Sequence, residues 1–183
     1  SDGGLTKSGS GTLTLSGDNT YTGGTTLSDG EIDITNGSAL GTGDLSMADG
    51  TTLGFTLGDL DLTNNVDLSG GTATVDTGSN NESLSGVISG AGALAKDGSG
   101  TLTLNGENTY TGGTRLAVGE IDVANNSALG TGTLTMAADT VLGFISDKLA
   151  LANDLLLSGG TATGAHGSHS ETLDGVISGA GQL

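Results

Sequence analysis

The sequence contains no cysteine and no proline, and aromatic residues make up only 2% of its 183 residues. Without cysteine there is no disulfide, which fits the cytosol or an exported protein that must stay unfolded in transit. Hydrophobic residues make up 33% of the chain, below the roughly 45–50% of ordinary globular domains. The composition therefore argues against a compact globule, whose centre needs large apolar side chains.

Basic residues are also scarce. The chain has 21 acidic residues against four basic ones, Lys7, Lys96, Arg115 and Lys148, and a formal net charge of −17. Phosphate binding needs clustered positive charge, so we expect neither nucleic acid nor an anionic membrane surface as a partner. The acidity favours solubility and keeps like particles apart.

Long apolar runs are missing too. None approaches the roughly 18 residues of a membrane-spanning helix, so we expect no membrane insertion by this segment. No secretory signal begins at Ser1. The chain starts and stops within a repeat, because Leu183 is the counterpart of Leu94 and Leu5. We therefore expect a segment of a longer repetitive protein.

A long internal repeat dominates what is present. The run from Ser10 to Thr25 returns as the run from Ser99 to Thr114, and the offset of 89 residues holds along the chain without a gap. A gapless repeat of this length is typical of stacked units, since an insertion would shift every later layer. We predict one domain over residues 1–183, built from two tandem units at about 5–93 and 94–182.

Within each unit, short alternating runs predict strands. Residues 12–16 alternate Thr-Leu-Thr-Leu, which is the pattern of a strand with one buried face. Glycine, asparagine and aspartate separate the runs and predict turns. The side chains predicted to point inward include, among others, the following residues: Leu13, Ile32, Ile34, Leu45, Met47, Leu53, Phe55, Leu62, Val66, Leu68, Ala73, Val75, Leu84, Val87 and Ile88.

The recurrence predicts a coil. Leu13, Ile32, Leu53 and Ala73 lie 19–21 residues apart, a spacing that suits one turn of a β-helix. Dividing the repeat by four predicts about four coils per unit and about eight in all, or a rod on the order of 40 Å long. The high charge and scarce aromatics make disorder a competitor, but the alternating aliphatic pattern argues against it. The fold class is all-β, with helix content near zero.

The run at residues 11–27 resembles the autotransporter-associated β-strand repeat, also called the passenger-associated transport repeat. Its second copy covers residues 100–116, with Arg115 where the first copy has Thr26. The resemblance implies a right-handed parallel β-helix. It also implies part of an autotransporter passenger domain from a Gram-negative bacterium, exported by type V secretion. Such passengers cross the outer membrane and lie at the cell surface or are secreted.

The same resemblance implies partners. Many such passengers are adhesins or self-associating surface proteins, and the repeat itself is linked to efficient secretion. We therefore expect a host or bacterial surface protein or glycan as the partner, or a second copy of the protein. The absence of cysteine agrees, since disulfides formed early hinder translocation in this family.

Candidate metal ligands are weak. His166 and His169 form a His-x-x-His pair, and Glu171 is a conceivable third ligand. Their counterparts in the first unit, Thr77 and Asn80, are not histidines, so the pair is not a feature of the repeat. We favour a polar loop at a coil corner and predict no metal site and no cofactor.

Carboxylate pairs recur in both units. The pairs Glu31 with Asp33, and Glu120 with Asp122, lie on the outward face of a predicted strand. A calcium site or a general acid–base pair is conceivable, although a solvated strand face is the preferred interpretation. A third acidic group is an alternative patch, formed by the following residues: Asp59, Asp61 and Asp67.

Catalytic motifs are not found. Carbohydrate-active enzymes on this fold use clustered aspartates with a basic residue, whereas Arg115 has no acidic partner predicted beside it. Tyr21 and Tyr110 could stack on sugars, but we expect each to pack over a glycine corner. The leading hypothesis is a structural and adhesive segment that supports adhesion, self-association or secretion and is not an enzyme. The alternatives are a β-helix carbohydrate-active enzyme and a calcium-stabilised spacer.

Overall fold

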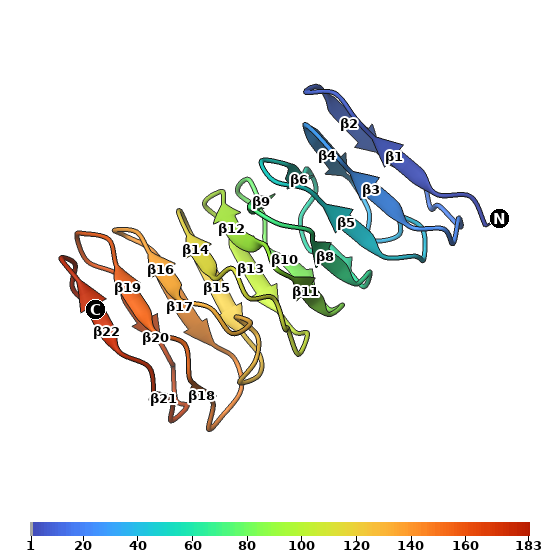
Figure 1. Cartoon of the computed structure of the whole chain (residues 1–183). Coiled ribbons are helices and arrows are strands. Elements are labelled where there is room, and N and C mark those ends of the chain that lie inside the picture. The colour runs from blue at the N-terminus through green and yellow to red at the C-terminus, as the bar shows by residue number, and fades with distance from the viewer. Residues whose placement is uncertain (1) are drawn as a thin grey trace.

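The structure is a computed structural model that describes residues 2–183, and its regular structure is entirely β-strand. The strands wind into a parallel β-solenoid whose turns lie side by side from the N-terminal to the C-terminal end (Figure 1). No helix is present among the described residues, so none of them forms a helix that could cross a membrane. The predictions of an all-β fold and of a solenoid are confirmed.

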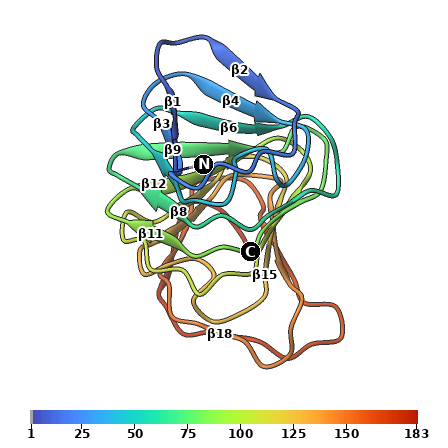
Figure 2. The same ribbon diagram turned by 90° about the vertical axis from the view of Figure 1, so that its right-hand side faces the viewer.

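Three sheets form three sides of the rod, which we call faces A, B and C (Figure 2). Face A contains β1 (Leu5–Lys7), β3 (Thr25–Leu27), β5 (Leu45–Met47), β8 (Val66–Leu68) and β11 (Ile88–Gly90). Face B contains β2 (Thr12–Leu15), β4 (Glu31–Ile34), β6 (Thr52–Phe55), β9 (Thr72–Asp76), β12 (Ala93–Asp97), β14 (Thr114–Leu116), β16 (Leu134–Met136), β19 (Leu155–Leu157) and β22 (Ile177–Gly179).

Face C contains β7 (Asp61–Leu62), β10 (Glu82–Leu84), β13 (Thr101–Leu104), β15 (Glu120–Val123), β17 (Val141–Phe144) and β20 (Thr163–Ala165). A small fourth sheet pairs β18 (Ala150–Leu151) with β21 (Thr172–Leu173). Every pair is parallel. Each strand therefore bonds to its equivalent in the next turn, and the turns are held together by backbone hydrogen bonds.

The register gives the length of each turn. Leu13 pairs with Ile32, Ile32 with Leu53 and Leu53 with Val75, so these turns contain 19, 21 and 22 residues. The expected partner Ala73 is wrong, because Ala73 pairs with Leu94 instead. From β2 to β22, face B spans eight turns, which at roughly 4.8 Å per turn makes a rod about 40 Å long.

The two units do not repeat on the same face. The inward column that begins at Lys7 and continues through Leu27 lies on face A, whereas its counterpart from Lys96 through Leu116 lies on face B. Four turns carry Leu5 to Ile88, which is 83 residues, and six more residues reach the next strand. The predicted four turns per unit is therefore corrected to four and one-third.

This fraction rotates unit two by one face about the rod axis. The irregular segment around Tyr21 stacks on the segment around Thr42 along face C. Its counterpart around Tyr110 stacks on β11 of face A, where Thr109 donates to the carbonyl of Ile88 at 2.8 Å. Face A is thus a sheet in unit one and irregular in unit two, while face B is a sheet throughout.

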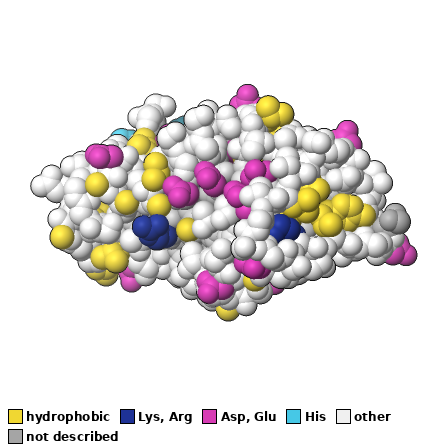
Figure 3. All heavy atoms as spheres, turned by 90° about the horizontal axis from the view of Figure 1, so that it is seen from above, with side chains coloured by type: hydrophobic (Ala, Val, Ile, Leu, Met, Phe, Trp, Pro, Cys, Tyr) yellow, Lys and Arg dark blue, Asp and Glu magenta, His cyan; other side chains and the backbone are white. Residues whose placement is uncertain are grey.

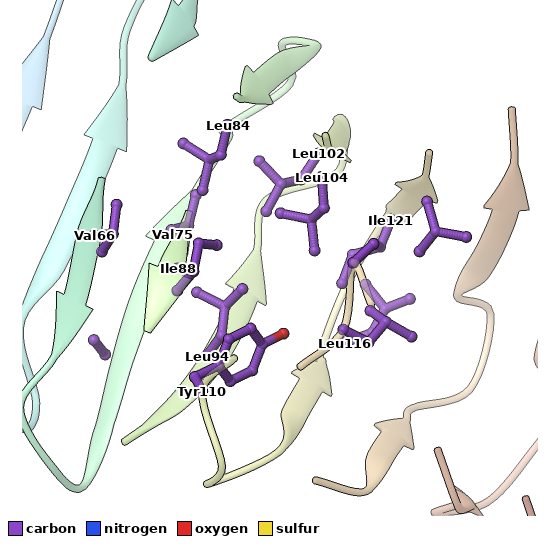
Figure 4. Close-up of a cluster of buried hydrophobic side chains, with 14 of the residues drawn as sticks. Val66, Val75, Leu84, Ile88, Leu94, Leu102, Leu104, Tyr110, Leu116 and Ile121 are labelled. Carbon is purple, nitrogen blue, oxygen red and sulfur yellow. The ribbon is translucent and has the colours of Figure 1, made fainter. Parts of the chain in front are cut away.

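Slim aliphatic side chains from all three faces fill the interior (Figure 4). Because side chains alternate along a strand, each strand sends every second residue inward, as in the buried–half-buried–buried pattern of β5. The prediction for Val87 is wrong. Ile88 is completely buried, but Val87 stands at the corner before β11 with 39% of its surface exposed.

Candidate functional site

Two lysines point into the solenoid instead of into water. Lys96 is fully buried, and its Nζ donates to the carbonyl oxygens of Asp97, Gly98 and Val118 at 2.9, 2.6 and 3.2 Å. Burial lowers the pKa of Lys96 to about 8, although the charges of Asp76 and Asp97 act in the opposite direction. The ammonium group thus fastens a corner of the rod across two successive turns.

Lys7 does the same in unit one, where its Nζ donates to the carbonyls of Gly9 and Asp29. The corner needs glycine beside the ammonium group. Gly30 has φ +75°, and a Cβ there would lie 2.7 Å from the Lys7 Nζ. Gly119 has the same φ beside Lys96. Sequence reasoning counted both lysines only as charges, although the Leu-x-Lys alternation places each on the inward side.

The two tyrosines close the corner after the irregular segment. The Tyr110 hydroxyl lies 2.5 Å from that of Thr114, which donates to the carbonyl of Leu129 at 3.3 Å. Tyr21 makes the same contact with Thr25 at 2.6 Å. Tyr110 is completely buried and burial raises its pKa. The ring of Tyr110 therefore packs inside the corner and is not exposed for sugar stacking.

An inward carboxylate is a feature that sequence reasoning missed. Glu82 is 2% exposed; its Oε2 accepts the Leu60 N–H at 2.8 Å, and its buried Oε1 has no partner among residues 2–183. Burial raises the pKa of Glu82 to about 7, the Leu60 hydrogen bond lowers it and the charge of Asp59 raises it. The alternation Glu-Ser-Leu in β10 placed Glu82 on the face of Leu84.

Glu171 is the counterpart of Glu82 and repeats its geometry. Its Oε2 accepts the Leu149 N–H at 2.8 Å, and its Oε1 is buried without a partner in the described chain. The conceivable third metal ligand therefore bonds into the rod. His169 places its Nδ1 3.0 Å from the Phe144 carbonyl, and His166 is exposed at the turn before it.

No group of three or more histidine or acidic side chains within residues 2–183 is close enough to hold a metal ion. The third expected acidic group is not brought together either. Asp61 lies on face C and accepts a hydrogen bond from Ser85 at 2.6 Å, whereas Asp67 lies on face A. Asp59 occupies a turn with φ 61°.

The two carboxylate pairs lie on outward strand positions as expected. Glu31 accepts a hydrogen bond from Thr12 at 2.9 Å, and Asp33 leans over Gly54 of the next turn, where a Cβ would clash with its carboxylate. Burial, the charge of Glu31 and a hydrogen bond with Glu31 raise the pKa of Asp33, as does the charge of Asp76.

In unit two the same arrangement occurs around Gly143. Burial raises the pKa of Asp122 to about 6, with Glu120 adding its charge and a hydrogen bond. Each pair can therefore hold one shared proton. From above, acidic side chains gather near the middle of the rod between apolar areas (Figure 3). On face B, Arg115 has Ala95 and Thr135 as its neighbours in the adjacent turns.

These features describe a class of protein: a rod of stacked turns whose conserved-looking positions fasten corners. Comparison with known proteins is consistent with that class. The passenger-associated-transport-repeat model matches residues 5–34 and 94–123. Its two matches cover the segments that carry Lys7 and Lys96, and Tyr21 and Tyr110.

A second comparison gives a relative. Over 135 residues, or 66% of this chain, the sequence is 36% identical to a protein described as adhesin BmaC autotransporter, from Brucella suis biovar 1 (strain 1330). The chain spans only 4% of that protein's length. No solved structure matches the chain.

The chain carries two passenger-associated transport repeats and is similar to part of an autotransporter adhesin, so the resemblance identified from the sequence is confirmed. The repeats and the relative indicate an autotransporter passenger segment that is exposed at the cell surface or secreted.

Proposed function

We propose that this chain is a structural and adhesive segment of a surface passenger, and that it is not an enzyme. The observation that carries the proposal is the rod itself. Eight parallel turns present long regular faces whose outward positions are mostly polar, while conserved chemistry at the corners is spent on holding the turns together. The described adhesin relative supports a role in contacting another surface.

The partner in this proposal is a protein or glycan on a host or bacterial surface, or a second copy of the rod. Stability of the rod would come from bonds between neighbouring turns and from the stacked aliphatic columns, summed along its length. A rod of this kind holds a contact surface away from the cell without needing a large globular core.

Beads coated with the purified chain provide the test. We expect them to bind cultured epithelial cells or to clump with one another, whereas beads coated with the heat-unfolded chain do neither. Folded rods that produce no attachment and no clumping would contradict the adhesive role. Hydrolysis of acidic polysaccharides by the chain would favour the enzyme alternative, and melting that changes on chelation would favour the calcium-stabilised spacer.

A further inference from the structure

Two hollows of the same construction lie on the rod, one in each unit. The first has a volume of about 310 Å³ and lies between residues 18–20, 37–42 and 63–64 of three neighbouring turns. The second, of about 220 Å³, is lined by Asn108 and by residues in 126–131 and 152–153. Every residue that lines the second hollow is the counterpart, 89 positions later, of a residue that lines the first.

Asparagine side chains hold the walls. Asn19 and Asn64 donate to carbonyl oxygens of the middle turn at 2.7 and 2.6 Å. In unit two, Asn108 and Asn153 make the counterpart bonds at 2.6 and 2.7 Å. Because these bonds tie three successive turns together, each hollow is formed before any ligand arrives, and binding would cost little ordering of the protein.

A glycine keeps the first hollow open. Gly41 has φ +67°, and a Cβ there would lie 3.0 Å from the Tyr21 ring and collide with the Tyr21 carbonyl oxygen. Gly130 takes the same conformation beside Tyr110. The repeated Tyr and Gly positions therefore build the hollow as well as the corner.

Hydroxyl groups stand at the rim of the first hollow. The side chains of Thr20, Ser38, Thr42 and Thr63 are exposed and make no hydrogen bond within residues 2–183. Hydroxyls both donate and accept, so they match the hydroxyl groups of a sugar. In unit two Ala152 replaces Thr63, and the second hollow offers fewer such groups.

Charge selects among sugars. No lysine, arginine or histidine lines either hollow in the described chain, Asp18 is the one charged residue at the first, and the whole sequence carries −17. An anionic sugar would be repelled. The volume of about 310 Å³ lies at the small end of ligand pockets, which span roughly 300–1,000 Å³, so it suits one ring.

We propose that these two hollows are subsites that each bind one ring of a neutral glycan. As the contact by which the rod meets a glycosylated surface, this inference rests on the proposed adhesive function. The rotation by one face places the first subsite on face C and the second on the side of face A, so two neighbouring units engage glycans on different sides of the rod.

Titration followed by two-dimensional amide NMR tests the subsites. With methyl glycosides of glucose, galactose, mannose and N-acetylglucosamine, we expect at least one to cause saturable shifts in residues 18–20, 37–42 and 63–64. A single ring in a shallow site should bind with a dissociation constant on the order of 1–10 mM. Sialic acid and glucuronic acid should cause none. Absence of saturable shifts with every neutral glycoside, or equal shifts with the acids, overturns the proposal.

Matched variants assign the shifts. Ser38→Trp fills the first hollow and Ser127→Trp the second, and each should abolish the shifts of its own unit only. Both positions are exposed, so the remaining resonances report an intact fold. Thr63→Ala, which copies Ala152, should weaken binding in unit one about threefold. Binding that survives Ser38→Trp overturns the assignment for unit one.

The two proposals fail separately. Beads that attach to cells although NMR finds no sugar binding would retain the adhesive role and overturn the subsites. Beads that attach to nothing, while NMR finds the neutral sugar in both hollows, would overturn the adhesive role and retain the subsites. Attachment that is lost in the double tryptophan variant, and that free neutral glycoside inhibits, supports both.

Discussion

Units one and two share a backbone but not an environment. Unit one (residues 5–93) carries eleven acidic residues and one basic residue, whereas unit two (residues 94–182) carries nine and three. Lys7 and Tyr21 lie in the first turns and are covered by the rest of the rod on one side only, while Lys96 and Tyr110 are completely enclosed. The repeat thus reproduces each contact, and the position along the rod decides how much that contact contributes to stability.

The tyrosine corner should show the largest difference between the units. We expect Tyr110→Ala to lower the free energy of unfolding by about 4 kcal/mol, because it removes a buried ring, and Tyr21→Ala to lower it by about 2 kcal/mol. Urea denaturation followed by far-UV circular dichroism measures both. Tyr110→Phe, which only strands the Thr114 hydroxyl, should cost about 1 kcal/mol. Equal losses for Tyr21→Ala and Tyr110→Ala would show that enclosure by neighbouring turns is irrelevant.

The lysine corner comes second. Lys96→Met keeps the apolar stem but leaves three carbonyl oxygens without their donor, and we expect a loss of about 3 kcal/mol. Lys7→Met removes two bonds at a more open corner and should cost about 1 kcal/mol. Denaturant midpoints and hydrogen exchange at residues 117–119 and 28–30 report the effects.

Arg115→Met is the matched control for the lysines, since Arg115 is exposed on face B. It should change stability by less than about 0.5 kcal/mol. If Lys96→Met behaves like this control, the ammonium group contributes nothing to the corner.

The inward glutamate should make the rod more stable in mild acid. The pKa of Glu82 is about 7 in the folded chain against a model value of 4.5, so the folded state retains the proton as pH rises between them and stability falls over that window. We expect Glu82→Gln to flatten this dependence and to stabilise the rod at pH 8 by about 2 kcal/mol. Thermal midpoints measured from pH 4 to 8 provide the test.

Ser83→Ala, on the outward side of the same strand, should leave the pH dependence unchanged. Asp59→Asn should move the Glu82 transition to lower pH, because the charge of Asp59 raises the pKa of Glu82. A steeper dependence in the Glu82→Gln variant would show that another group controls the acid response.

The carboxylate pairs should give the smallest effect. The pKa of Asp122 is raised from 3.8 to about 6, so ionisation between these values costs stability, and Asp122→Asn should stabilise the rod at pH 7.5 by about 1 kcal/mol. Asp33→Asn should act in the same direction in unit one. Melting in EDTA and in calcium chloride is the measurement. A calcium-induced rise in the midpoint that Asp122→Asn abolishes would show that the pair holds a cation.

The sequence predicted most of the backbone of this rod. Alternation in runs such as Thr-Leu-Thr-Leu identified the strands, and the regular recurrence of inward residues identified about eight turns. Both follow from local rules, since side chains alternate across any strand and a stacked coil must repeat. The same alternation contained the inward positions of Lys7, Lys96 and Glu82, but their charge made an outward interpretation seem natural, and only the carbonyl-lined corners explain the two lysines.

What the sequence alone determined is the family of the repeat, the parallel coil and its slim aliphatic interior, because these depend on spacing along the chain. Only the tertiary structure decided that 89 residues make four and one-third turns, since turns of 19–22 residues differ too little for spacing to reveal the sum. That fraction of a turn sets which side of the rod each corner and each hollow occupies. It arises from hydrogen-bond register between turns, which no single stretch of sequence contains.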